Sequence, residues 1–208
     1  MVPITRVFVL SLVLFFSSPL KKIYLIIGLA VLIALSPVAW HFLKPYQKNR
    51  IEAFINPTID PHGAGYNVSQ SKIAVGSGGL WGTGLGKGSQ SQLNFLPVAH
   101  TDFIFAGTAE ATGFVGSLIL FSLLFFLILR VINVAQTAKD DFGMYLGIGF
   151  GVMLLFQILV NIGMNIGIMP VTGIPLPFVS YGGSAMLSNM AAIGILQSIY
   201  ARHKKINF

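Results

Sequence analysis

Two carboxylates near the middle of the sequence are the side chains best placed to do chemistry. The chain has only six acidic residues, and two of them belong to one long apolar stretch, with Asp102 at its border and Glu110 inside it. Eight residues of helix would separate them by about 12 Å along the axis. Carboxylate pairs that hydrolyse a glycosidic bond stand roughly 5 to 9.5 Å apart, so this pair is not predicted to act on one bond.

Each of these carboxylates also has a use of its own. Thr101 or Asp102 precedes an apolar run and could be the N-cap of a helix, and the pattern alone favours that interpretation over a catalytic one. Glu110 lies about eight residues into a predicted membrane span, where an ionisable side chain is costly enough to be a functional candidate by default. His100 is interpreted as a surface residue.

A second set of polar residues lies in a later apolar stretch. Gln157, Asn161 and Asn165 recur at four-residue intervals, so they form one stripe along a helix. The favoured interpretation is hydrogen bonding between helices, and the alternative is the lining of a polar cavity. The spacing of Gly143, Gly147 and similar glycines in the same stretch predicts that a neighbouring helix approaches closely.

Residues 76–88 are rich in glycine and invite comparison with a phosphate-binding loop. They do not fit a Walker motif, because Trp81 and Gly88 stand where glycine and a hydroxyl residue are required. Exposed backbone N–H groups with Lys72 and Lys87 nearby could still cradle a pyrophosphate. A flexible re-entrant loop is an equally good interpretation.

The composition places all of these residues in a membrane protein. Of the 208 residues, 54% are hydrophobic and 9% are charged, against roughly 25% charged in a soluble domain, and the mean hydropathy is +0.79. The absence of cysteine excludes disulfides, thiolate metal sites and thiol catalysis. The net charge of +7 has no dense basic run, which favours contact with anionic lipid over nucleic acid.

The hydropathy pattern predicts an all-α integral membrane protein with about five transmembrane helices. Four are clear and one is short, at residues 23–43, 103–129, 142–169, 179–201 and, for the short one, 7–20. Three parts are expected: two N-terminal spans in residues 1–43, an extracytoplasmic loop at 44–101 with amphipathic and glycine-rich segments, and three C-terminal spans with a loop at 170–184 in residues 102–208. Basic residues are almost evenly divided between the two sides, but the basic tail favours a cytoplasmic C-terminus.

Two ordered motifs carry a family resemblance. Residues 64–105 contain Ala-Gly-Tyr-Asn, Gln-Ser-Lys-Ile-Ala-Val-Gly-Ser-Gly-Gly, Gln-Ser-Gln-Leu-Asn-Phe-Leu-Pro and His-Thr-Asp-Phe-Ile-Phe, and residues 169–184 read Met-Pro-Val-Thr-Gly-Ile-Pro-Leu-Pro-Phe-Val-Ser-Tyr-Gly-Gly-Ser. Both resemble the RodA/FtsW/SpoVE (SEDS) family of peptidoglycan glycosyltransferases, the RodA branch most closely. Members of that family have about ten spans, so the chain resembles the C-terminal half of the fold.

The resemblance implies a bacterial cytoplasmic-membrane enzyme for cell-wall synthesis, serving cell shape or division. It would polymerise lipid II, an undecaprenyl-pyrophosphate-linked disaccharide-peptide, at the outer face of the membrane, with a class B penicillin-binding protein as partner. Asp102 would be the catalytic residue. The substrate-binding candidates are Arg50, Lys72 and Lys87 for the pyrophosphate, with Glu110, Gln157, Asn161 and Asn165 in an internal cavity. A divalent cation is a candidate cofactor, and its protein ligands are not specified.

Two other functions stay open at this stage. One is a lipid II flippase, in which the polar stripe and Glu110 line a path across the bilayer. The other is an inactive fragment that binds a class B penicillin-binding protein through its outer loop. Because the chain resembles only half of the fold, the activity of these 208 residues alone is also open.

Overall fold

The computed structural model describes residues 44–55, 63–92 and 100–202, with isolated helical positions at 23, 27, 28, 31, 34, 35 and 41. Throughout this described part the regular structure is helical, which confirms the predicted all-α class. The predicted span at 7–20, and most of the one at 23–43, lie outside the described residues.

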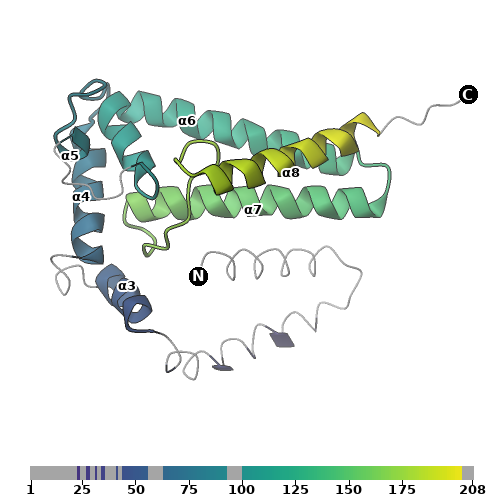
Figure 1. Cartoon of the computed structure of the whole chain (residues 1–208), viewed down its shortest axis with the longest axis horizontal. Helices are drawn as coiled ribbons and strands as arrows, with labels where there is room; N and C mark the ends of the chain where they lie inside the picture. Colours follow the sequence, from purple (N-terminus) through teal and green to yellow (C-terminus); the bar gives the residue numbers. More distant parts are fainter. Residues whose placement is uncertain are drawn as a thin grey trace, which may run out of the picture.

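Six helices make up the described part of the chain. They are α3 (Pro45–Ile55), α4 (Ala64–Ser77), α5 (Ser89–Gln92), α6 (Ile104–Gln136), α7 (Asp141–Asn165) and α8 (Gly183–Ala201). In Figure 1, α6 and α7 lie side by side with α8 along them, and α4 runs across one end of this bundle. Among the described helices, α6 and α7 are long and apolar enough to cross a membrane.

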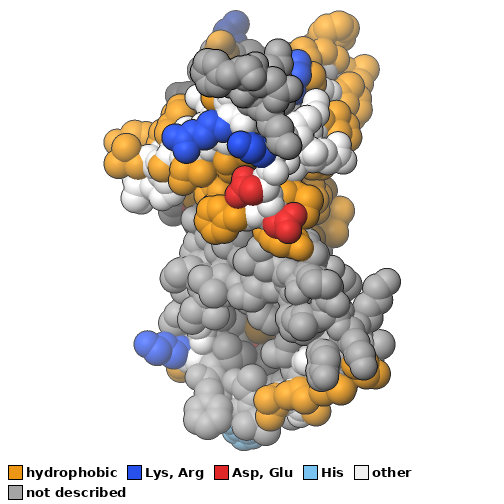
Figure 2. Space-filling model, turned by 90° about the vertical axis from the view of Figure 1, so that its right-hand side faces the viewer, with side chains coloured by type: hydrophobic (Ala, Val, Ile, Leu, Met, Phe, Trp, Pro, Cys, Tyr) orange, Lys and Arg blue, Asp and Glu red, His pale blue; other side chains and the backbone are white. Residues whose placement is uncertain are grey.

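The two ends of the bundle differ in character. We call the end beside α3 and α4 the Asp102 end, and the opposite end, where α6 turns into α7, the Lys139 end. Figure 2 views the Lys139 end and shows basic and acidic side chains gathered there. Lys139, Asp140 and Arg202 line a cleft of about 700 Å³ at this end. The Asp140 side chain caps α7 by accepting a hydrogen bond from the Gly143 N–H at 3.4 Å.

The predicted close packing of α7 is confirmed against the second half of α6. A Cβ atom added at Gly147 would lie 2.8 Å from the Cβ of Ala135, and one at Gly151 would lie 3.3 Å from Cγ1 of Val131. Real Cβ atoms do not approach other carbons as closely as the first of these distances. The missing side chain of Gly147 is therefore what allows α6 and α7 to come together at this level.

Helix α6 is broken at Gly113, which the sequence did not predict. Gly113 has φ 69° and ψ −164°, a conformation outside the helical region that glycine adopts without steric cost. Residues 114–136 form a straight segment of about 34 Å, enough to cross a bilayer, whereas residues 104–112 turn away as a short helix of their own (Figure 1). The predicted span at 103–129 therefore consists of two helical pieces, and Glu110 lies in the short piece that precedes the break.

The glycine-rich segment 78–88, here called the glycine loop, completes the backbone hydrogen bonds at this break. The four bonds are Thr83 N–H to Glu110 O (2.9 Å), Gly84 N–H to Ala111 O (3.1 Å), Phe114 N–H to Gly79 O (2.8 Å) and Val115 N–H to Leu80 O (3.2 Å). A Cβ atom at Gly82 or Gly113 would collide with the opposite backbone. The loop thus supplies the donors and acceptors that a continuous helix would have provided for itself. Backbone N–H and C=O groups in apolar surroundings need such partners because no water is available to them.

Candidate functional site

Asp102 lies in the turn before α6, where three distant parts of the chain meet. A Cβ atom added at Gly173 would stand 3.3 Å from Oδ2 of Asp102 and 3.8 Å from Nη1 of Arg50. Arg50 comes from α3, and Gly173 from the segment between α7 and α8. Gly173 has φ +72°, which glycine tolerates, and its lack of a side chain lets this backbone lie close to the carboxylate and the guanidinium.

Arg50 is held at this point by the same segment. Its Nη1 donates a hydrogen bond to the backbone oxygen of Val171 at 3.4 Å. A guanidinium has five N–H donors in a fixed plane, so it can keep this bond and still bind the oxygens of a phosphate. The arrangement places a proton acceptor and an anion-binding group next to one another.

The surroundings of Asp102 tune its acidity in opposing directions. Partial burial raises the pKa of the Asp102 carboxyl above its usual range. The positive charge of Arg50 and a hydrogen bond with the Thr101 side chain both lower it. A carboxylate with a raised pKa is a stronger base, and Arg50 keeps it ionised, so the group is suited to accept a proton near neutral pH.

Two amides of the polar stripe hold the backbone of Asp102 in place. Asn161 Nδ2 donates to the backbone oxygens of Asp102 (3.0 Å) and Ile174 (2.8 Å). Asn165 Nδ2 donates to the same Asp102 oxygen at 3.2 Å, and its Oδ1 accepts from the Ala106 N–H at 3.0 Å. Both side chains are fully buried. They fix the turn containing Asp102 against α7 and against the segment that carries Gly173.

Hydroxyl and backbone groups hold the rest of this turn. The Ser180 hydroxyl donates to the Thr101 backbone oxygen at 2.7 Å, and the Tyr181 N–H donates to the His100 oxygen at 2.9 Å. The Ser71 hydroxyl of α4 donates to the backbone oxygen of Asn165 at 2.7 Å. The turn is thus supported from α4, from α7 and from residues 180–181. Such support from several elements is what a preorganised site requires.

The N-cap interpretation of Asp102 and Thr101 is wrong. The residue at the N-cap of α6 is Phe103, whose side chain accepts no hydrogen bond from the first turn of the helix. One donor of the first turn, the Ala106 N–H, is instead bonded to Asn165. The Asp102 carboxylate is consequently not used to begin the helix.

Other predicted site residues lie apart from this arrangement. Lys72 is exposed on α4, with the end of its side chain against Gly167, and Lys87 is exposed in a turn of the glycine loop. Glu110 is fully buried, and its Oε1 accepts a hydrogen bond from the Gln90 N–H at 2.9 Å, which ties α5 to α6. Gln157 is fully buried, and neither amide atom has a partner within the described part of the chain.

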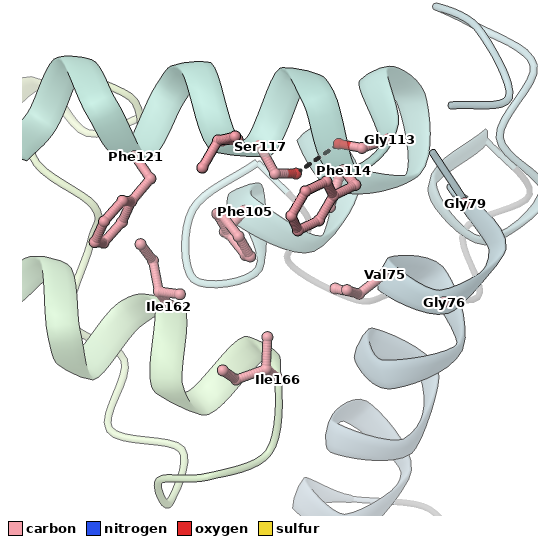
Figure 3. Close-up of a pocket in the computed structure, with 12 residues that line it drawn as sticks. Val75, Gly76, Gly79, Phe105, Gly113, Phe114, Ser117, Phe121, Ile162 and Ile166 are labelled. Atoms are coloured by element: carbon pink, nitrogen blue, oxygen red, sulfur yellow. Dashed lines mark hydrogen bonds between the residues drawn. The ribbon is translucent and has the colours of Figure 1, made fainter. Parts of the chain in front are cut away.

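An apolar groove of about 410 Å³ lies between α4, α6 and α7 (Figure 3). Its polar lining residue, Ser117, already donates its hydroxyl hydrogen to the Gly113 oxygen at 2.8 Å. The groove is lined by Val75, Gly76 and Gly79, by Phe105, Ala109, Gly113, Phe114, Ser117, Leu118 and Phe121, and by Ile162 and Ile166. Such a lining suits an apolar chain and not a sugar or a phosphate, so this groove is chemically distinct from the Asp102 site.

Comparisons with known proteins identify the family. Residues 3–205 match the profile of the cell cycle proteins FtsW, RodA and SpoVE. The chain belongs to the FtsW/RodA/SpoVE family. It is 49% identical over 185 residues to the peptidoglycan glycosyltransferase MrdB of Escherichia coli K12, an alignment that covers 88% of this chain and 50% of MrdB. It is 47% identical over 160 residues to the peptidoglycan glycosyltransferase RodA of Treponema pallidum, covering 77% of this chain and 37% of that protein.

A solved structure supports the same assignment for the fold. It comes from work on the structural coordination of polymerization and crosslinking by a peptidoglycan synthase complex, and it matches with a TM-score of 0.76 at 31% identity. The match covers 97% of this chain and 55% of that one. The chain therefore spans about half the length of the FtsW/RodA/SpoVE relatives it matches.

Three residues of the candidate site in this FtsW/RodA/SpoVE family member were not singled out from the sequence. They are Gly173, whose backbone lies close to Asp102, and Ser71 and Ser180, which support its turn. Gly173 carries a signal, because it stands between Pro170 and Pro175 in a segment where a turn is expected. Nothing in the spacing of Ser71 or Ser180 marks which backbone oxygen each one reaches.

Proposed function

We propose that this chain forms part of a peptidoglycan glycosyltransferase that polymerises lipid II, with Asp102 as the general base. The observation that supports this is the half-buried Asp102 carboxylate beside Arg50, with the backbone of Gly173 close to both. The names of the curated relatives support the same reaction class. Because the chain spans about half of those relatives, we assign the activity to the complete protein.

In this proposal the acceptor sugar places its 4-hydroxyl against Asp102. The carboxylate takes the hydroxyl proton while the oxygen forms a new bond to the anomeric carbon of the donor sugar. The bond from that carbon to the phosphate oxygen breaks, and the lipid pyrophosphate leaves with the electron pair. Arg50 is the described basic residue whose charge acts on the Asp102 site, so it is assigned to the departing pyrophosphate.

We also propose substrate contacts for the other polar and basic residues. Lys72 and Lys87 are exposed and would bind the pyrophosphate before or after the reaction. Glu110, Gln157, Asn161 and Asn165 are buried and would contact substrate in an internal cavity. Within the described residues no three His, Asp or Glu side chains gather as a metal site. The residues present fit a divalent cation only as Mg²⁺ often binds, through one carboxylate, here Asp102, and substrate phosphates. Such an ion would neutralise charge on the pyrophosphate.

We further propose a class B penicillin-binding protein as the partner. The support is the similarity to a chain of the solved peptidoglycan synthase complex, in which polymerisation and crosslinking are coordinated. We place the protein in the bacterial cytoplasmic membrane with the Asp102 end outside and the C-terminus in the cytoplasm. The basic side chains at the Lys139 end, together with the basic tail that follows Ala201, support this orientation.

The proposal is tested with the complete protein reconstituted in vesicles with its partner and fluorescent lipid II. Asp102→Asn keeps the shape of the side chain and removes the base, so glycan polymer should fall by about 10²- to 10⁴-fold. Asp141→Asn is the matched control, because Asp141 is an exposed carboxylate at the Lys139 end. It should polymerise at the parent rate.

Two outcomes would count against the proposal. Polymerisation by Asp102→Asn at the parent rate would remove Asp102 from the mechanism. Movement of lipid II across sealed vesicles by the parent protein, with no growth of glycan chains, would favour the flippase interpretation instead.

A further inference from the structure

The tip of the glycine loop exposes three large apolar side chains. Leu80, Trp81 and Leu85 are 66%, 81% and 85% exposed, and we call them the loop tip. Scattered apolar residues on a surface are ordinary, but three within six residues of one loop offer apolar surface for a contact. The same segment carries Lys87 and, between residues 76 and 92, no acidic residue.

The loop tip is presented on a fixed support. The four backbone hydrogen bonds described above join the glycine loop to both sides of the α6 break. The Thr83 hydroxyl adds a fifth bond, to the Glu110 oxygen at 3.0 Å. Glycines at 78, 82 and 113 allow the two backbones to touch. Leu80 and Trp81 are therefore held at a fixed position along the axis of α6.

The length of α6 relates the level of the loop tip to the thickness of a bilayer. Arg130, near the Lys139 end of α6, and Phe114, where the loop is attached, are sixteen residues or about 24 Å apart along the helix. The Arg130 guanidinium stacks over the Phe126 ring at 5.0 Å, and a long basic side chain can reach from within the bilayer to the head groups. With a hydrocarbon layer of about 30 Å, the other boundary then falls within a few ångströms of the glycine loop.

The loop tip also continues an apolar strip that faces outward from α6. Phe114 and Leu118 are exposed on the first turns of the straight segment. The Val115 N–H donates to the Leu80 oxygen, so the tip begins directly beside this strip. Tryptophan is enriched where the head groups meet the acyl chains, because it has a large apolar ring with one N–H donor.

We infer that the loop tip is an interfacial anchor, with Leu80, Trp81 and Leu85 inserted into the bilayer leaflet at the Asp102 end. Its partner is the lipid surface at the level of the head groups and first acyl carbons. Lys87 faces phosphate groups there. The anchor sets the depth of the glycine loop and hence of the Gly113 break. This inference is independent of the proposed reaction.

Tryptophan fluorescence tests the anchor directly, because the chain contains only Trp40 and Trp81. Trp40→Phe leaves Trp81 as the single emitter in the 208-residue chain, which is then reconstituted alone into phosphatidylglycerol and phosphatidylcholine vesicles. Phospholipids brominated near the head group should quench at least half of the emission, and phospholipids brominated near the chain end should quench much less. Iodide in the water should have little effect.

A second emitter checks that the whole tip is inserted. In the Trp40→Phe, Trp81→Phe background, Leu85→Trp should show the same dependence on bromine depth. If Trp81 and the Trp at position 85 are quenched by iodide and not by brominated lipid, the tip faces water. The anchor is then refuted, and a protein partner becomes the better explanation. Strongest quenching by deep bromines would also refute it, since the tip would lie in the hydrocarbon core.

Discussion

Replacing Asn165 by Leu measures how strongly the polar stripe holds the Asp102 turn. The Asn165 side chain is fully buried, and Leu has nearly the same shape, so the change removes hydrogen bonds without opening a large cavity. The shorter bonds lost are Ala106 N–H to Oδ1 (3.0 Å), Nδ2 to Asn161 O (2.8 Å) and Nδ2 to Asp102 O (3.2 Å). Two longer ones, from the Ser71 hydroxyl to Oδ1 and from Nδ2 to Asn161 Oδ1, are each 3.4 Å.

The loss in the free energy of unfolding depends on which hydrogen bonds the former partners of Asn165 keep. The Asp102 oxygen keeps its bond from Asn161, so it stays satisfied. The Ala106 N–H is in the first turn of α6, where no intrahelical acceptor exists, and it is left unpaired. An unpaired buried N–H costs about 1–3 kcal/mol, and the lost bond to the Asn161 oxygen adds about 0.5–1.5 kcal/mol. We expect a free energy of unfolding lower by about 2–4 kcal/mol.

Thermal unfolding of the purified protein in detergent is a suitable assay. At about 2–4 °C per kcal/mol for a chain of this size, Asn165→Leu should lower the Tm by roughly 5 to 15 °C. Asn133→Leu is the matched control, because Asn133 is exposed near the Lys139 end and the chemical change is identical. Equal Tm values for the two variants would refute the reasoning that Asn165 supports the site.

Three further predictions concern Gly113, Arg50 and Gly147. Gly113→Ala should lower the Tm by several degrees, because φ 69° and contact with the glycine loop exclude a side chain, whereas Gly194→Ala, which meets nothing within 4 Å, should leave the Tm unchanged or raise it. Arg50→Gln removes the charge that lowers the pKa of Asp102, so the acidic limb of the polymerisation rate should shift to higher pH in a pH–rate profile; an unchanged limb would contradict this. Gly147→Leu should separate α6 from α7 and lower the Tm by more than Gly194→Leu does.

The sequence predicts the long helices well and the loop poorly, for a physical reason. The apolar lengths that become α6, α7 and α8 are properties of single segments, so they can be read without knowledge of their neighbours. Helix α4 was missed because its glycine, serine and asparagine residues have low helix propensity. Its helical state depends on packing against the rest of the protein, where Val68, Ser71 and Ala74 are buried.

The candidate site shows the same division. The scarcity of carboxylates and the family motif were enough to select Asp102. The proximity of Arg50 and Gly173 was not predictable, since each comes from a different segment and no spacing relates them. For the polar stripe, four-residue spacing predicted a shared face, and the favoured interpretation of bonds between helices is confirmed for Asn165. Whether the stripe also contacts substrate stays a prediction.

The shared backbone at Gly113 has a consequence for how the protein is assembled in the membrane. Part of the hydrogen bonding of α6 belongs to a segment made earlier in the chain, so α6 cannot be completed as an independent helix when it leaves the insertion machinery. The glycine loop lacks these hydrogen-bond partners until residues 110–115 are in place. The glycine loop and residues 110–115 therefore reach their final hydrogen-bonded structure together.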